Sequence, residues 1–219
     1  MLEIGCGTGQ ATVSLAARRY AVTAVELGAS LAEVASANLV AYRSVEVLNE
    51  DFEWWQGPEA AFDLVVCATA WHWIDPATRL ERVAAALRPG GVVAVIDTVH
   101  VAGTSDAFFA AAQRCYERWD PDTPPGLLLP GLDTLPPAGS HELDRAEQFE
   151  DVELQRFGAR HAYTAWPYLE LLSTFSGHRA LPADRLEGLF GCLRRLIDAE
   201  PKSMITKSSV FELRTAVRR

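Results

Sequence analysis

Residues Leu2–Gln10 read LEIGCGTGQ, and this stretch decides the fold. A short apolar run leads straight into the alternating glycines Gly5, Gly7 and Gly9, after which a helical pattern begins. Such glycines let the chain turn tightly from a strand into a helix and leave bare main chain for a ligand. The dinucleotide fingerprint has the different spacing G-x-G-x-x-G. Glu3 would repel a pyrophosphate there and suits a ligand with an ammonium group.

Short apolar runs alternate with helical patterns along the first hundred residues, which is typical of βαβ units and a parallel sheet. We expect Ser30 to cap the second helix and Arg88–Gly91 to end the third. The expected strands are 2–4, 21–26, 45–48, 62–67 and 92–97, and the expected helices are 10–19, 30–40 and 75–87.

The second half of the chain has a different pattern. Residues 120–140 are rich in Pro, Gly and Asp and predict a long binding loop or lid. Helices are expected at 108–119, 166–176 and 184–200, and strands at 152–162 and 209–217. Two late strands favour an antiparallel C-terminal edge on a mostly parallel sheet. We therefore expect one α/β domain over 1–219, a Rossmann-like three-layer αβα sandwich.

Composition narrows the function classes. The chain has 219 residues, 49% hydrophobic, with a net charge of −9, which disfavours binding to nucleic acid through the whole surface. No signal peptide or membrane span is evident. The cysteines show no C-x-x-C pair, so we expect no disulfide, no metal site and a cytoplasmic protein. They are Cys6, Cys67, Cys115 and Cys192.

Two further acidic positions fit a nucleoside ligand. Glu26 ends the second expected strand, 21 residues after Gly5, where an acid accepts hydrogen bonds from ribose hydroxyls in Rossmann-like folds. The alternative is a solvated surface glutamate. Asp51 and Phe52 follow the third strand, where a carboxylate accepts from an exocyclic amine and a ring packs on a purine. A purely structural role is the alternative for this pair.

The ordered set of these motifs resembles the class I S-adenosylmethionine (SAM)-dependent methyltransferases, over residues 1 to about 100. The resemblance implies a seven-stranded sheet with SAM as the cofactor in the half 1–100, and an acceptor-side cap with the C-terminal strands in 101–219. It also implies the cofactor-binding residues, which are Glu3, Gly5, Cys6, Gly7, Gly9, Glu26, Leu27, Asp51, Phe52 and Ala68.

The segment after the fourth strand is similar to an alanine-rich His-Trp segment of a subgroup that includes trans-aconitate methyltransferases. There His72 would act as a general base or orient an acceptor oxygen, and Trp71 and Trp73 would line the acceptor pocket. Packing against the next helix is the alternative. His178 and Arg179 resemble the C-terminal half of the same subgroup and would meet an anionic acceptor.

These features predict an enzyme that methylates a small molecule, on a carboxylate or hydroxyl oxygen, as a monomer or homodimer without a nucleic acid or membrane partner. Family members have one or two helices before the first strand, so we expect the natural start to lie upstream. An inactive SAM-fold binding or dimerisation module is the main alternative. An NAD(P)-dependent oxidoreductase would need the dinucleotide spacing and a Tyr-x-x-x-Lys pair, which the chain lacks.

Overall fold

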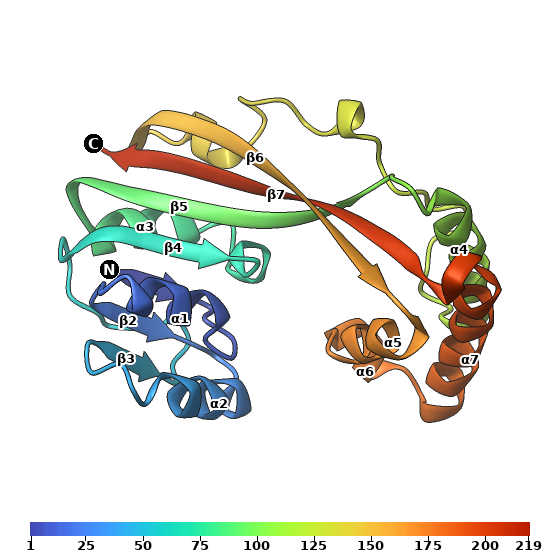
Figure 1. The fold of residues 1–219 in the computed structure, drawn as a ribbon. Helices are drawn as coiled ribbons and strands as arrows, with labels where there is room; N and C mark the ends of the chain where they lie inside the picture. The colour runs from blue at the N-terminus through green and yellow to red at the C-terminus, as the bar shows by residue number, and fades with distance from the viewer. The chain divides into compact units, whose positions relative to one another are not determined.

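A computed structural model describes residues 1–175 and 177–219 (Figure 1). Seven strands form one sheet in the order β3-β2-β1-β4-β5-β7-β6. The strands are β1 (Leu2–Ile4), β2 (Val22–Val25), β3 (Val45–Leu48), β4 (Phe62–Ala68), β5 (Leu87–Val101), β6 (Phe149–Tyr163) and β7 (Ile205–Arg218). The helices are α1 (Gln10–Ala17), α2 (Ala29–Leu39), α3 (Arg79–Ala86), α4 (Asp106–Trp119), α5 (Ala165–Ser173), α6 (Ser176–Ala180) and α7 (Ala183–Ala199), with 3-10 turns at Trp71–Trp73, Leu132–Thr134, Glu142–Arg145 and Pro201–Ser203.

The pairs among β3, β2, β1, β4 and β5 are parallel. Strand β7 runs antiparallel to β5 in Figure 1. This confirms the predicted mixed α/β sheet of Rossmann-like type with an antiparallel C-terminal edge. Strand β1 is only three residues long and fully buried, because it pairs with β2 on one side and β4 on the other. Its central place puts the glycine turn at the carboxyl ends of the parallel strands, where ligands bind in such sheets.

Three local predictions were wrong. Gly28, not Ser30, caps the start of α2, and its N–H donates to the Glu26 carboxylate. Helix α3 begins at Arg79, later than expected. Strand β5 begins at Leu87, before the expected residue 92. Helix α3 does end at Ala86, beside the Arg88–Gly91 segment that was expected to end it, but that segment is an irregular stretch inside β5, since Phe62 of β4 pairs with Leu87 and Leu64 pairs with Val92. Extra residues in one strand of a pair form a bulge.

The chain divides into two compact units. Unit 1 comprises Met1–Thr98, Pro136–Phe157 and Phe211–Arg219, and unit 2 comprises Val99–Leu135 and Gly158–Val210. In unit 1, buried side chains of β1, β4 and β5 pack with Leu143, Phe149 and Ala216. Helices α1 and α2 lie against β2 and β3. In unit 2, helices α4, α5 and α7 pack together around a core that includes Phe108, Leu189 and Leu193.

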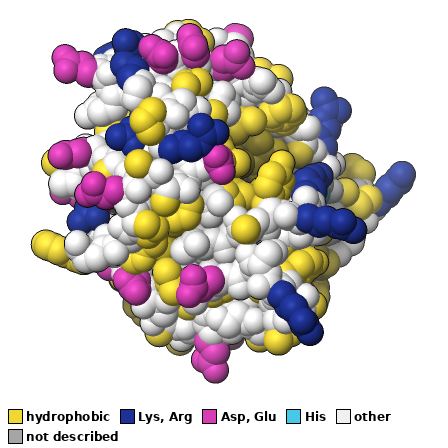
Figure 2. All heavy atoms as spheres, turned by 90° about the vertical axis from the view of Figure 1, so that its left-hand side faces the viewer, with side chains coloured by type: hydrophobic (Ala, Val, Ile, Leu, Met, Phe, Trp, Pro, Cys, Tyr) yellow, Lys and Arg dark blue, Asp and Glu magenta, His cyan; other side chains and the backbone are white. Residues whose placement is uncertain are grey.

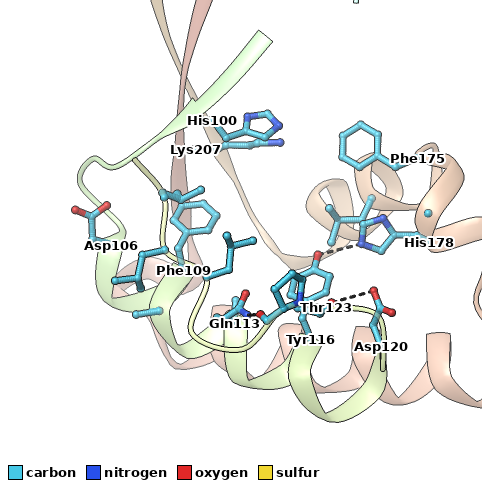
Figure 3. A pocket seen from close by; sticks show the side chains of 18 of the residues that line it. His100, Asp106, Phe109, Gln113, Tyr116, Asp120, Thr123, Phe175, His178 and Lys207 are labelled. Atoms are coloured by element: carbon cyan, nitrogen blue, oxygen red, sulfur yellow. Dashed lines mark hydrogen bonds between the residues drawn. The ribbon is translucent and has the colours of Figure 1, made fainter. Parts of the chain in front are cut away.

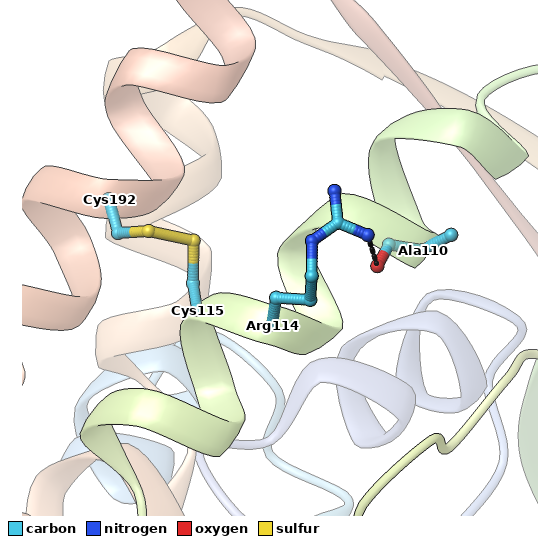
Figure 4. The surroundings of a disulfide bond; sticks show 4 residues. All are labelled: Ala110, Arg114, Cys115 and Cys192. Carbon is cyan, nitrogen blue, oxygen red and sulfur yellow. Dashed lines mark hydrogen bonds between the residues drawn. A yellow bond between two sulfur atoms is a disulfide. The ribbon is translucent and has the colours of Figure 1, made fainter.

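A disulfide joins α4 to α7 within unit 2 (Figure 4). It links Cys115 and Cys192, whose Cα atoms are 5.9 Å apart. The expectation of unpaired cysteines was therefore wrong for these two, because the packing of α4 on α7 brings together residues that are 77 apart in the chain. Cys6 and Cys67 are free and buried. A reducing compartment was inferred from the expected lack of disulfides, and the disulfide removes that support. A cytoplasmic location stays a prediction.

Charged side chains of both signs are scattered over the face drawn in Figure 2, so this face is not uniformly basic. Within residues 1–175 and 177–219, no helix combines the length and the apolarity that a membrane span requires. The same part of the chain contains no cluster of three or more His, Cys, Asp and Glu side chains placed to hold a metal ion.

Candidate functional site

The glycine turn after β1 has the backbone that its sequence predicts. Gly5 and Gly7 adopt φ values of +69° and +58°, in the left-handed region that favours glycine. The Gly5 N–H donates to the carbonyl of Val25 at 2.8 Å, which holds the turn against the end of β2. A Cβ at Gly5 would lie 2.4 Å from the Cβ of Ala70, so this position has no room for a side chain.

Gly7 differs from Gly5 because the space beside it is open. A Cβ built at Gly7 would meet no protein atom within 4 Å. A side chain is therefore not excluded there by packing inside the protein. Bare main chain facing open space at the end of a parallel strand is a cradle for a ligand that lies against the backbone.

Glu26 ties the glycine turn to the loop that follows β2. One carboxylate oxygen accepts from the Gly7 N–H and the other from the Gly28 N–H, each at 2.8 Å. The side chain is only 8% exposed, so it is not the solvated glutamate of the alternative reading. Each carboxylate oxygen has more than one acceptor site, so ribose hydroxyls can still bind. The Asn49 amide, which the sequence did not single out, donates to the carbonyls of Glu26 and Leu27.

Glu3 and Cys6 are buried at the base of the turn. Glu3 is 1% exposed, and its Oε2 has no hydrogen-bond partner among the described residues. Burial raises the pKa of Glu3, and the nearby Thr12 hydroxyl offsets part of that rise without reaching hydrogen-bond geometry. Burial, with the negative charges of Glu3 and Glu26, raises the pKa of the Cys6 thiol to about 12, so it stays protonated. A buried carboxylate without a hydrogen-bond or ion-pair partner is energetically costly, so this group favours a cationic ligand.

The predicted adenine contacts lie in different environments. Leu27 is 70% exposed, and the Asp51 Oδ1 accepts from the Glu53 N–H at 2.9 Å in a local turn. Phe52 is 6% exposed and its ring packs near Trp55 in the core of unit 1. The free purine-facing ring expected from the sequence is thus not present in this structure. A contact of Phe52 with adenine stays a prediction.

The end of β4 contains a strained residue that the sequence did not reveal. Thr69, between Ala68 and Ala70, has φ +58°, which is unusual for a β-branched side chain. Its N–H donates to the carbonyl of Ile96 at 2.7 Å. Strain of this kind persists only where the surroundings enforce it and gathers at functional sites. Thr69 follows Ala68, the residue predicted to approach SAM through its backbone.

Trp71 is buried in the core of unit 1, and its expected contact with an acceptor stays a prediction. The side chain is 3% exposed, and its indole N–H donates to Glu142 Oε1. The Arg79 guanidinium lies 5.1 Å from the centre of the ring and pairs with Glu142 at 2.6 Å. Trp71 is therefore a core residue that anchors the segment after β4. His72 and Trp73 are exposed, Trp73 by 72%, and their rings lie 4.9 Å apart. Their proposed contact with an acceptor stays a prediction.

A cavity of about 810 Å³ lies within unit 2, and His178 lines it (Figure 3). The His178 Nε2 and the Tyr116 hydroxyl are 3.0 Å apart, and burial raises the Tyr116 pKa to about 12. Arg179 is exposed and does not line this cavity. His178 therefore lines the cavity and Arg179 does not, and their expected contact with an anionic acceptor stays a prediction. Most of the lining is apolar, from α4, α5 and residues 127–129.

His100 lines the same cavity, and its environment leads us to expect that the free energy of unfolding depends on pH. Burial, with the nearby Lys207 ammonium, lowers its pKa from 6.5 to about 4. Between these values the unfolded chain binds a proton that the folded chain does not, so stability falls as the pH drops from 6.5 to 4. We expect His100→Gln to flatten this slope in chemical denaturation curves. Equal slopes for both proteins below pH 6.5, with equal stability at pH 8, would contradict the assignment.

The comparisons with known proteins bear on this site. Residues 1–91 match a family model described as a methyltransferase domain. An uncharacterised methyltransferase of Mycobacterium tuberculosis is 31% identical over 153 residues, which are 65% of this chain and 73% of the relative. The chain belongs to the methyltransferase family. The resemblance to class I SAM-dependent methyltransferases is thereby confirmed.

Other relatives match less than half of this methyltransferase chain. A trans-aconitate 2-methyltransferase of Methylobacterium radiotolerans is 36% identical over 95 residues, 43% of this chain and 36% of the relative. The chain likewise spans 38% of the length of further mycobacterial methyltransferases. The solved YcgJ protein of Bacillus subtilis shares the fold, with a TM-score of 0.58, 20% identity and coverage of 100% of this chain and 91% of that one.

Proposed function

We propose that the chain transfers a methyl group from SAM to a small-molecule acceptor, on a carboxylate or hydroxyl oxygen. The cradle at Gly7 carries this proposal, because open main chain there is joined through Glu26 to the loop after β2. When bound, SAM supplies a methyl group that its sulfonium has already activated. The trans-aconitate relative supports a carboxylate acceptor.

The residues of unit 1 fit the cofactor in three respects. The unpaired oxygen of buried Glu3 suits the ammonium group of the methionine part. The open side of Gly7 leaves room for the ligand against the main chain. The two oxygens of Glu26 keep acceptor sites for the ribose diol. Asp51, Phe52 and Leu27 would surround the adenine, and Ala68 would approach the sulfur side.

The acceptor side needs little acid–base chemistry if the acceptor is a carboxylate. An ionised carboxylate oxygen is ready to attack, so the protein mainly has to align it and exclude water. A hydroxyl acceptor needs a group that removes its proton, and we propose exposed His72 on the segment after β4 for this role. The predicted acceptor-side cap, residues 101–219, would supply the contacts to the acceptor. It overlaps most of unit 2, which contains the 810 Å³ cavity.

The test is calorimetric titration with S-adenosylhomocysteine, the product that remains after methyl transfer. We expect a single site per chain and a rise in the melting temperature on saturation, because the ligand binds only the folded state. Absence of both heat and thermal shift at high ligand would overturn the proposal. Methyl transfer from labelled SAM to a panel of carboxylates and phenols then identifies the acceptor class.

A further inference from the structure

Lys207 is a buried cation in an apolar cavity. It lies in the part of β7 that belongs to unit 2, is 9% exposed, and lines the cavity of about 810 Å³. Figure 3 shows its side chain beside His100 on the wall opposite Phe175 and His178. Its Nζ lies 5.4 Å from the centre of the Phe175 ring, the one favourable contact recorded for it among residues 1–175 and 177–219.

Among the residues that the structure describes, no carboxylate forms an ion pair with this ammonium group. Every ion pair found within the described chain involves an arginine. Two of the three acids that line the same cavity already accept hydrogen bonds within the protein: Asp106 accepts from the Gly103 N–H, and Asp120 accepts from Thr123 and from the Asp122 N–H. The third, Asp122, forms no ion pair with Lys207. Burial alone lowers the pKa of Lys207, and no nearby acid raises it again. A charge that is partly withdrawn from water and has no partner carries a desolvation cost, and an anionic ligand group would reduce that cost.

The polar groups around Lys207 complete a small anion site. His100 lies close enough for the Lys207 charge to lower its pKa, and its Nδ1 is 3.1 Å from the Ser209 hydroxyl. Its other ring nitrogen is left to serve a ligand. On the far side, the His178 Nδ1 is buried without a partner among the described residues. The cavity lining contains one cation, neutral imidazoles and three acids, which are Asp106, Asp120 and Asp122. This balance of charges favours a ligand with a single negative charge over a phosphate dianion.

The remaining lining fits an extended apolar body. It comes from Phe109, Ala112, Leu127, Leu128, Tyr168 and Leu172. Leu127 and Leu128 belong to the loop that the sequence marked as a lid or binding segment. Concave, mostly apolar cavities with a few convergent polar groups are the usual sites for small molecules.

We propose that this cavity binds an amphiphilic monocarboxylic acid, with its carboxylate paired to the Lys207 ammonium and its apolar body along α4, α5 and residues 127–129. As a ligand site the cavity stands on its own observations. The further step, that such an acid is the methyl acceptor of this chain, rests on the proposed function.

The experiment compares decanoate with decanol, its neutral counterpart, by calorimetric titration of the full chain. We expect decanoate to bind about tenfold more tightly or better, because a charge-assisted pair in a desolvated site is worth at least that factor. Lys207→Met should abolish this preference while leaving decanol affinity unchanged. Lys202→Met is the matched control, because Lys202 is exposed, lies in the same unit and is the only other lysine.

A second measurement uses the wild-type chain and so does not depend on the variant folding. Decanoate should protect Lys207 from reductive methylation, read by peptide mass spectrometry, while Lys202 reacts at its normal rate. Equal affinities for acid and alcohol, no binding of either, or no protection of Lys207 would overturn the inference. Failure of S-adenosylhomocysteine to bind, with decanoate still bound, would sink the proposed function and leave this ligand site standing.

Discussion

Alanine at position 7 is expected to remove S-adenosylhomocysteine binding while the chain stays folded. The new Cβ meets no protein atom within 4 Å, so the fold accommodates it. It would occupy the space in which the ligand lies against bare main chain. A steric clash of this kind costs about 3 kcal/mol, which corresponds to about a hundredfold in affinity. We therefore expect affinity to fall by about a hundredfold or more in calorimetric titration.

Gly90→Ala is the matched control for the backbone effect of this substitution. Gly90 also has a left-handed backbone, at φ +73°, and also has open space around it. Both variants should therefore lose a similar stability, about 1 kcal/mol, because alanine disfavours this conformation. Only Gly7→Ala should lose the ligand. Equal affinity for S-adenosylhomocysteine in the two variants would place the cofactor elsewhere.

Reduction of the disulfide is expected to lower the free energy of unfolding of unit 2 by about 4 kcal/mol, because the cross-link closes a loop of 77 residues. Denaturant titration of oxidised and reduced protein, followed by far-ultraviolet circular dichroism, measures the difference. Ligand binding to the cradle at Gly7 should persist after reduction, because both cysteines belong to unit 2 and the cradle belongs to unit 1.

The matched control is the double variant Cys115→Ser/Cys192→Ser, which should resemble the reduced protein and not respond to reductant. The buried thiols Cys6 and Cys67 remain in this variant and report any other effect of the reagent. An unchanged unfolding midpoint on reduction of the wild-type chain would show that the cross-link contributes nothing to unit 2.

The first five strands could be predicted because their signals are local. Strand β1 (Leu2–Ile4) and strand β3 (Val45–Leu48) have the predicted bounds, since short apolar runs ended by turn residues leave little choice. Strand β5 began earlier than expected. Its Arg88–Gly91 segment carries a turn signal, and the sheet absorbs that segment as a bulge instead of a stop.

The site was predicted less completely because its decisive contacts are not local. The role of Glu26 as a brace for Gly7 and Gly28 depends on the packing of two loops, which no spacing rule contains. The contacts of Trp71 with Arg79 and Glu142 join residues that are far apart in the chain or depend on the turn after β4, and no local pattern shows them. The Cys115–Cys192 bond and the buried charge of Lys207 likewise depend on tertiary packing.

The composition of unit 1 from three separated segments has a consequence for protein synthesis. Its core includes Ala216, from the last of those segments, so it cannot be complete until that part of β7 has left the ribosome. The last segment of unit 2 ends at Val210, so unit 2 can pack before the core of unit 1 is complete. Because segments far apart in sequence must close large loops before they gain contacts, the nascent cofactor cradle would be the later of the two to become rigid.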